Sequence, residues 1–136
     1  MHHNQILYLK KTVFQTIIFG NMAHLYHLYG GAISLSNSIS SFDDCLFDSN
    51  NVNSDGHNSH GGTIHFDKTS GTFKNCSFIN STTYAPNDHG HGGAFYCTTS
   101  SCIFIDCHFK DCSVRCVTKG YSYGGTIYFD KTSWNI

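Results

Sequence analysis

Histidines recur at a fixed place along the chain, where they could bind a metal ion. His60 and His91 each stand immediately before a pair of glycines, whereas tyrosine takes that place in two other copies. A fold that stacks the copies would bring the two imidazoles together, and imidazole nitrogen is a good ligand for transition metals. The groups that could complete such a site are His57, His89, Asp55 and Asp88. The alternative, which we favour, is that histidine only suits a polar turn here, so that no cofactor is expected.

A second set of side chains could bind a ligand without reacting with it. His65, Tyr96 and Tyr128 follow their glycine pairs at a common offset, and Asp67 and Asp130 come two residues after members of this column. Aromatic faces beside carboxylates can form a ledge for sugars or for a partner protein. Exposed tyrosines on a sheet are also common without any ligand. The sequence therefore leaves a binding ledge and an ordinary surface as alternatives.

Catalytic groups are harder to find. Cleavage of acidic polysaccharides needs clustered carboxylates or bound calcium, with Lys or Arg for the acid groups of the substrate. Asp67 and Asp130 should lie two coils apart with Thr98 between them, and Arg115 has no obvious carboxylate neighbour. No Ser-His-Asp set or phosphate loop can be argued either. We therefore expect no enzyme activity, and a polysaccharide lyase or hydrolase is the alternative.

All these residues are positioned by a repeat of about 31 residues. Each copy begins with a glycine pair in the words GGAI, GGTI or GGAF, followed by phenylalanine, Asp or Asn, cysteine and phenylalanine at constant intervals. Self-similarity at such a period indicates a solenoid, in which each copy buries its apolar side chains against its neighbours. The repeated structural positions are Gly30, Gly31, Phe42, Asp44, Cys45 and Phe47; Gly61, Gly62, Phe73, Asn75, Cys76 and Phe78; Gly92, Gly93, Phe104, Asp106, Cys107 and Phe109; and Gly124 and Gly125.

The periodicity inside a copy is that of strands. After each glycine pair the apolar residues alternate with polar or aromatic ones, as in Ile64 and Phe66 around His65. We expect three strands in each coil, a corner at the Asp or Asn position, and a loop where the copies vary in length. Stacked coils about 4.8 Å apart would pile like residues on one another. The predicted fold class is therefore all-β, a parallel β-helix.

The seven cysteines have two interpretations. Cys45, Cys76 and Cys107 should stack inside the core and point the same way, which favours free thiols that pack as small apolar residues. The remaining four, which could form one or two disulfides, are Cys97, Cys102, Cys112 and Cys116.

The repeat also defines the domain organisation. Residues 1–136 should form a single domain of about four and a half coils. Its parts are a degenerate first coil at 1–29, full coils at 30–60, 61–91 and 92–123, and an incomplete last coil at 124–136. Neither end shows the polar cap that usually protects the open edges of a solenoid. We therefore expect a fragment of a longer solenoid or a module that stacks end to end.

Composition and charge argue against some classes of partner. The net charge of −1 gives no basic stripe, so no nucleic-acid partner is expected. The chain contains no apolar run of the roughly 18 residues that a membrane helix needs, so we expect no transmembrane segment. Gln15 and Thr16 interrupt the apolar stretch after Lys11, which leaves no clear signal peptide.

Four of the repeat words resemble those of a known family. GGAI at Gly30, GGTI at Gly61 and Gly124, and FDSN at Phe47 are similar to the GGA-I and F-x-x-N repeats of the polymorphic outer membrane proteins. The resemblance implies a right-handed β-helix of the adhesin-like passenger type and a cell-surface or extracellular location. It implies a non-enzymatic task in adhesion or scaffolding, with a host or neighbouring surface protein or a glycan as partner. The alternatives are a polysaccharide-binding or polysaccharide-cleaving enzyme fragment and a fibre module that associates with itself end to end.

Overall fold

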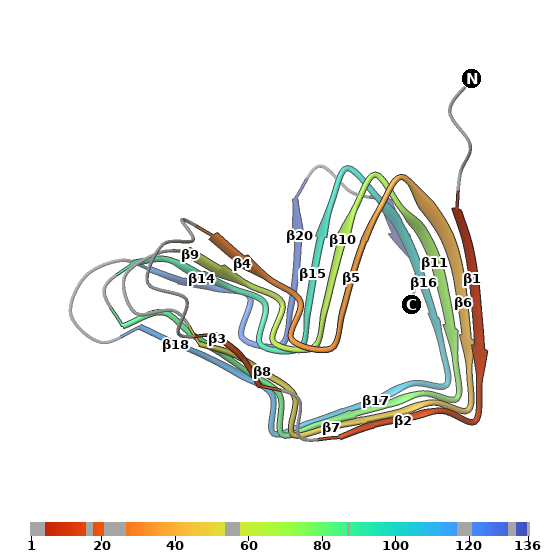
Figure 1. Ribbon diagram of the computed structural model, residues 1–136, viewed down its shortest axis with the longest axis horizontal. Coiled ribbons are helices and arrows are strands. Elements are labelled where there is room, and N and C mark those ends of the chain that lie inside the picture. The colour runs from red at the N-terminus through yellow and green to blue at the C-terminus, as the bar shows by residue number, and fades with distance from the viewer. Residues whose placement is uncertain are drawn as a thin grey trace.

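The chain winds into a β-solenoid of about three turns (Figure 1). The computed structural model describes residues 5–15, 18–20, 27–53, 58–86, 88–116, 121–130 and 133–135. All regular structure in these residues is strand, and the strand pairs are parallel. The predicted fold class, an all-β parallel β-helix, is therefore confirmed. Within the described segments, no helix has the length and apolar character to cross a membrane.

Each complete turn contributes five strands. The first consists of β5 (Ile33–Ser36), β6 (Ser38–Asp43), β7 (Leu46–Asp48), β8 (Asn51–Asn53) and β9 (Asn58–His60). The second consists of β10 (Ile64–Asp67), β11 (Ser70–Lys74), β12 (Ser77–Ile79), β13 (Thr82–Tyr84) and β14 (Gly90–His91). The third consists of β15 (Phe95–Thr98), β16 (Ser101–Ile105), β17 (His108–Lys110), β18 (Ser113–Arg115) and β19 (Ser122–Tyr123).

Flanking strands extend the same sheets. Before the first complete turn come β1 (Gln5–Lys10), β2 (Val13–Gln15), β3 (Ile18–Gly20) and β4 (His27–Tyr29). After the third come β20 (Ile127–Asp130) and β21 (Ser133–Asn135). We name each sheet after its strand in the middle turn: the β10 sheet (β5, β10, β15, β20), the β11 sheet (β1, β6, β11, β16, β21), the β12 sheet (β2, β7, β12, β17), the β13 sheet (β3, β8, β13, β18) and the β14 sheet (β4, β9, β14, β19).

The expectation of three strands in each coil is wrong. The stretch that was expected to be a loop carries two further strands, such as β13 and β14 in the middle turn. The sequence pattern does not indicate these strands, because their flanking residues are polar. In β8 and β13 only the central residues, Val52 and Thr83, point inward and are fully buried. The hydroxyl of Thr83 donates a hydrogen bond of 2.7 Å to the carbonyl of Gly92, which allows a polar residue to occupy the interior.

Phenylalanine ladders fill the core. Phe73 pairs in register with Phe42 and Phe104, and its ring stacks on theirs with centroids 4.6 and 5.1 Å apart. A second ladder runs through Phe47, Phe78 and Phe109 at 4.8 Å per step. These separations match the strand spacing within a sheet, so each turn buries its apolar residues against the turns on either side.

The corners between sheets use residues with a left-handed backbone. Where the β11 sheet meets the β12 sheet, Asp44, Asn75 and Asp106 have φ of 53°, 52° and 51°. Asp and Asn tolerate this conformation better than most residues. The following cysteines complete the corner: Cys76 Sγ lies 3.5 Å from the carbonyl oxygen of Phe42 and 3.3 Å from that of Lys74. All seven cysteines are free thiols, and Cys45, Cys76, Cys97 and Cys102 are buried.

The glycine pairs form the corner between the β14 and β10 sheets. Gly61 has φ of +63°, where a Cβ would lie 2.2 Å from the carbonyl oxygen of Ile64. A Cβ on Gly62 would lie 2.1 Å from the carbonyl oxygen of Gly93 in the next turn. Both positions therefore exclude any side chain, the first by conformation and the second by the close approach of stacked backbones.

Candidate functional site

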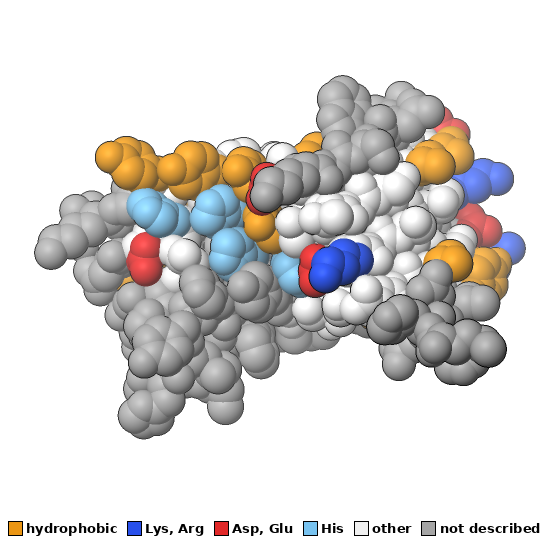
Figure 2. Space-filling view, turned by 90° about the horizontal axis from the view of Figure 1, so that it is seen from above, with side chains coloured by type: hydrophobic (Ala, Val, Ile, Leu, Met, Phe, Trp, Pro, Cys, Tyr) orange, Lys and Arg blue, Asp and Glu red, His pale blue; other side chains and the backbone are white. Residues whose placement is uncertain are grey.

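Two rows of rings meet in the corner between the β14 and β10 sheets. The side chains of His60, His91 and Tyr123 project outward from β9, β14 and β19. Those of His65, Tyr96 and Tyr128 project outward from β10, β15 and β20. We call these six residues the aromatic cluster. Figure 2 shows histidine side chains gathered on this face of the molecule, beside a row of hydrophobic side chains.

Contacts within each row follow the solenoid axis, and contacts between rows cross the corner. His60 stacks on His91 with ring centroids 4.6 Å apart, and His91 stacks on Tyr123 at 4.9 Å. In the other row His65 stacks on Tyr96 at 5.3 Å, and Tyr96 on Tyr128 at 5.6 Å. The rows are joined where the ring of His60 lies 4.7 Å from Tyr96 and that of His91 lies 5.1 Å from Tyr128. The cluster therefore packs as a small second core outside the solenoid.

Burial determines the protonation of this cluster. His65 is only 7% exposed, and its desolvation lowers the pKa to about 4 despite the opposing effect of Asp67. Burial and the neighbouring His89 also lower the pKa of His91. The Nδ1 atom of His65 lies 3.2 Å from the hydroxyl of Ser34. Both histidines are therefore neutral at physiological pH, and their rings pack against the tyrosines.

The predicted ledge is largely covered in the structure. His65 and Tyr96 are buried under the opposite row, with 7% and 9% of their surface exposed. Tyr128 is half-buried, and Asp67 and Asp130 are the last residues of β10 and β20, two positions after His65 and Tyr128. Asp67 accepts a hydrogen bond of 3.5 Å from the hydroxyl of Ser36. Little of the ring surface of His65 and Tyr96 is left for a ligand, because the β14 sheet folds back over it.

At the predicted metal site His60 and His91 lie side by side, but their rings are not oriented to bind one ion together. The ring planes of His60 and His91 are 9° from parallel. A nitrogen lone pair lies in the plane of its own ring, so two stacked rings do not aim at one ion between them. Among the described residues, no group of three or more His, Cys, Asp or Glu is placed to hold a metal. His57 and Asp55 lie outside the described residues, so the metal site stays a prediction.

The predicted separation of the carboxylates holds. Thr98 pairs with Asp67 on one side and with Asp130 on the other, so two strand spacings of roughly 10 Å in all separate the two Asp residues. The two carboxylates therefore do not act on one bond together.

A second site, which the sequence analysis missed, lies on the outer face of the β13 sheet. A shallow groove of about 300 Å³ is lined by Asn51, Asn53, Thr82, Tyr84 and Arg115, and we call it the Arg115 groove. Asn53, Tyr84 and Arg115 form one row across β8, β13 and β18. Asn51 and Thr82 belong to a parallel row two residues nearer the start of each strand. The groove therefore lies on the face of the sheet and extends from β8 across β13 to the edge strand β18.

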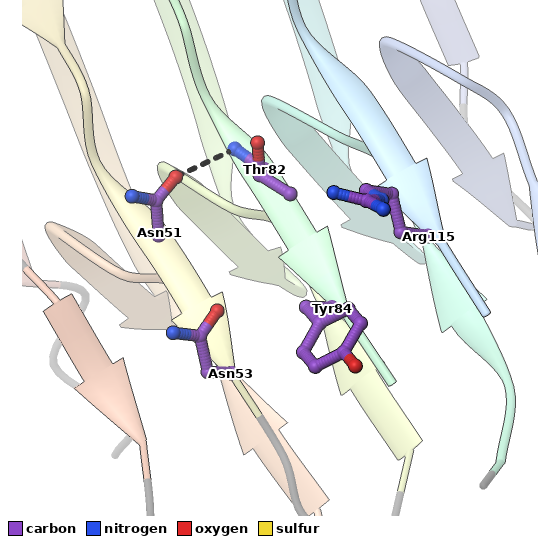
Figure 3. Close-up of a pocket in the computed structure, with 5 residues that line it drawn as sticks. All are labelled: Asn51, Asn53, Thr82, Tyr84 and Arg115. Carbon is purple, nitrogen blue, oxygen red and sulfur yellow. Dashed lines mark hydrogen bonds between the residues drawn. The ribbon is translucent and has the colours of Figure 1, made fainter. Parts of the chain in front are cut away.

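One side of the Arg115 groove is held in place by hydrogen bonds. The Oδ1 atom of Asn51 accepts a bond of 3.0 Å from the backbone N–H of Thr82, as Figure 3 shows. The Nδ2 atom of Asn51 donates to the carbonyl of Ser49 at 3.4 Å. On the other side the guanidinium of Arg115 lies toward β13, beside Thr82 and above the ring of Tyr84 in this view (Figure 3). The groove thus presents amides, a hydroxyl, an aromatic ring and one cation.

The signal for this groove was present in the sequence. Asn53, Tyr84 and Arg115 recur at the 31-residue spacing, as do Asn51 and Thr82. They were overlooked because this part of the copy was expected to be loop, and polar residues of different types form no visible ladder.

Comparisons of the chain with protein-family models, with curated proteins and with solved structures found no significant match.

Proposed function

We propose that this chain is a non-enzymatic binding module that recognises a glycan through the Arg115 groove. The observation that carries the proposal is the lining of the groove, which combines amide, hydroxyl, aromatic and guanidinium groups and includes no carboxylate. Amides and hydroxyls both donate and accept hydrogen bonds, which suits the hydroxyl groups of sugars. A tyrosine ring offers a flat apolar face for the C–H surface of a sugar ring.

Binding is favoured over hydrolysis because the groove lacks the pair of carboxyl groups that hydrolysis uses. Glycoside hydrolysis uses a pair of carboxyl groups on either side of the scissile bond. None of the five residues that line the groove is Asp or Glu. The remaining carboxylates of interest, Asp67 and Asp130, lie on a different sheet. The missing carboxyl pair disfavours a hydrolase, and a polysaccharide-cleaving enzyme remains the alternative proposal.

The setting of this module is part of the same proposal. The GGAI, GGTI and FDSN words support an adhesin-like β-helix of the polymorphic outer membrane protein type, located at a cell surface or outside the cell. A repeated scaffold with a side-chain groove on one face suits adhesion or structural scaffolding. Strands β1–β4 and β20–β21 support the finer proposal of about four and a half coils, with partial coils at 1–29 and 124–136.

A glycan array tests the proposal directly. The protein is applied to the array as wild type, as Tyr84→Ala and as Tyr8→Ala, the last being a matched control because Tyr8 is an exposed tyrosine on the β11 sheet. We expect wild-type binding to a subset of glycans, retained in Tyr8→Ala and lost in Tyr84→Ala. Absence of any glycan binding, or binding that survives Tyr84→Ala, would overturn the proposal.

A further inference from the structure

We propose that the Arg115 groove selects acidic saccharides, with Arg115 binding the carboxylate of a uronic-acid residue. This inference rests on the proposed function and adds the ligand class. The arginine is the only one in the chain, and it is exposed at the end of β18. Among the described residues, no carboxylate forms an ion pair with Arg115. The ion pair of these residues joins Lys10 to Asp43 at 3.4 Å, on the β11 sheet.

The chemistry of the guanidinium points to a carboxylate. Arginine presents parallel N–H groups that match the two oxygens of a carboxylate, and such charge-assisted pairs are stronger than neutral hydrogen bonds. In Figure 3 this group extends from β18 toward the middle of the groove, so an anion bound to it would also contact Thr82 or Tyr84. The lining contains no negative charge to repel that anion.

The neutral end of the groove suits the rest of a saccharide. Asn53 and Arg115 flank Tyr84 on the two neighbouring strands, so their backbones lie roughly 10 Å apart. Tyr84 lies between them as a platform for a sugar ring. The amide of Asn51 is held by two hydrogen bonds before any ligand arrives, which lowers the entropic cost of binding.

The centre of the groove suits a saccharide better than an acidic peptide. β13, which carries Thr82 and Tyr84, pairs with β8 and with β18 and has no free backbone groups to offer. β18 is an edge strand of this sheet, where an extended peptide would add by backbone pairing. A peptide bound there would lie beyond β18 and away from Tyr84, so a ligand that fills the groove is recognised by side chains, which fits a molecule rich in hydroxyl groups.

Calorimetric titration tests this inference with four probes: a uronic-acid trisaccharide, its methyl ester, a sulfated trisaccharide and an acidic hexapeptide. The variants are Arg115→Gln, Arg115→Lys and Lys110→Gln, a control that removes an exposed cation from β17 on the next sheet. We expect the uronate to bind wild type best. Arg115→Gln should weaken it about tenfold or more, Arg115→Lys less, and Lys110→Gln by less than about twofold.

Each other outcome overturns the inference in a recognisable way. Equal binding of the acid and its ester, with loss in Tyr84→Ala, would reject the carboxylate role but keep the glycan-binding function. Equal effects of Arg115→Gln and Lys110→Gln would reduce the role of Arg115 to general charge. If the sulfated probe or the peptide bound more tightly than the uronate, uronic acids would not be the ligand class of the groove. If none of the probes and no array glycan bound, both proposals would fail.

Discussion

The imidazole rings of His60 and His91 lie face to face, with centroids 4.6 Å apart and planes 9° from parallel. Residues 31 positions apart thus touch ring to ring, as stacking in register requires. Both rings also contact Tyr96 on the adjoining sheet, at 4.7 and 5.7 Å. The pair therefore makes contacts both along the solenoid axis, between successive turns, and across the corner, with the adjoining sheet.

Acid should destabilise the protein through its buried histidines. His65 has a pKa of about 4 in the folded state against about 6.5 when unfolded, because burial disfavours the charged ring. The unfolded state thus binds more protons between these values, so the stability is complete above pH 6.5 and is lost as pH falls toward 4. The loss from His65 alone should reach about 3 kcal/mol in the free energy of unfolding.

Urea unfolding at pH 7.5, 6, 5 and 4.5 measures this dependence. In His65→Tyr, which copies Tyr96 in the same column, the slope between pH 6.5 and 4.5 should flatten. His108→Gln is the control, because His108 is exposed on β17. An identical slope in wild type and His65→Tyr would contradict the prediction.

The second glycine of each pair should tolerate a methyl group only where no turn stacks above it. Gly62→Ala would push a Cβ to 2.1 Å from the carbonyl oxygen of Gly93, which is backbone and cannot move aside. We expect a loss of about 3 kcal/mol or more, seen as a lower urea midpoint. Gly125→Ala makes the same change at the equivalent position, where nothing lies within 4 Å, and should leave the midpoint almost unchanged. Equal losses in both variants would show that close backbone approach is not the cause.

Truncating a side chain of the central phenylalanine ladder should reduce the free energy of unfolding several times more than truncating an exposed apolar side chain. Phe73 is fully buried between Phe42 and Phe104, so Phe73→Ala should reduce the free energy of unfolding by about 3–5 kcal/mol. Ile39→Ala removes an apolar side chain that is 45% exposed on the same sheet and should cost about 0.5 kcal/mol or less. Chemical unfolding monitored by circular dichroism provides both values. Similar costs would refute the assignment of the core.

Two half-buried cysteines should differ in reactivity. A hydrogen bond from the Cys76 thiol lowers the pKa of Cys107 to about 7, whereas burial raises the pKa of Cys112. Because the thiolate is the reactive form, iodoacetamide at pH 7.5 should alkylate Cys107 before Cys112 in the native protein. Peptide mass spectrometry after short labelling times gives the order. Faster labelling of Cys112 would disprove the role of the Cys76 hydrogen bond.

The sequence by itself determined what lies above and below each residue. A constant spacing in a parallel solenoid stacks like on like, so the contacts of Phe73 with Phe42 and of His60 with His91 follow from counting along the chain. The same counting placed Thr98 between Asp67 and Asp130. These relations run along the axis, where neighbouring strands are held at one spacing by backbone hydrogen bonds.

Only the tertiary structure decided what lies beside each residue within a turn. The path of a turn depends on its corners, where left-handed residues such as Asp44 and Gly61 set the angle between sheets, and the repeat period carries no information about those angles. The sharp bend at the glycine pairs folds His60 over Tyr96 and buries a column that the alternation pattern placed at the surface. Strand β13 brings Tyr84 beside Arg115 where the sequence indicated a loop. Both sites owe their shape to contacts across the turn, which a one-dimensional pattern does not specify.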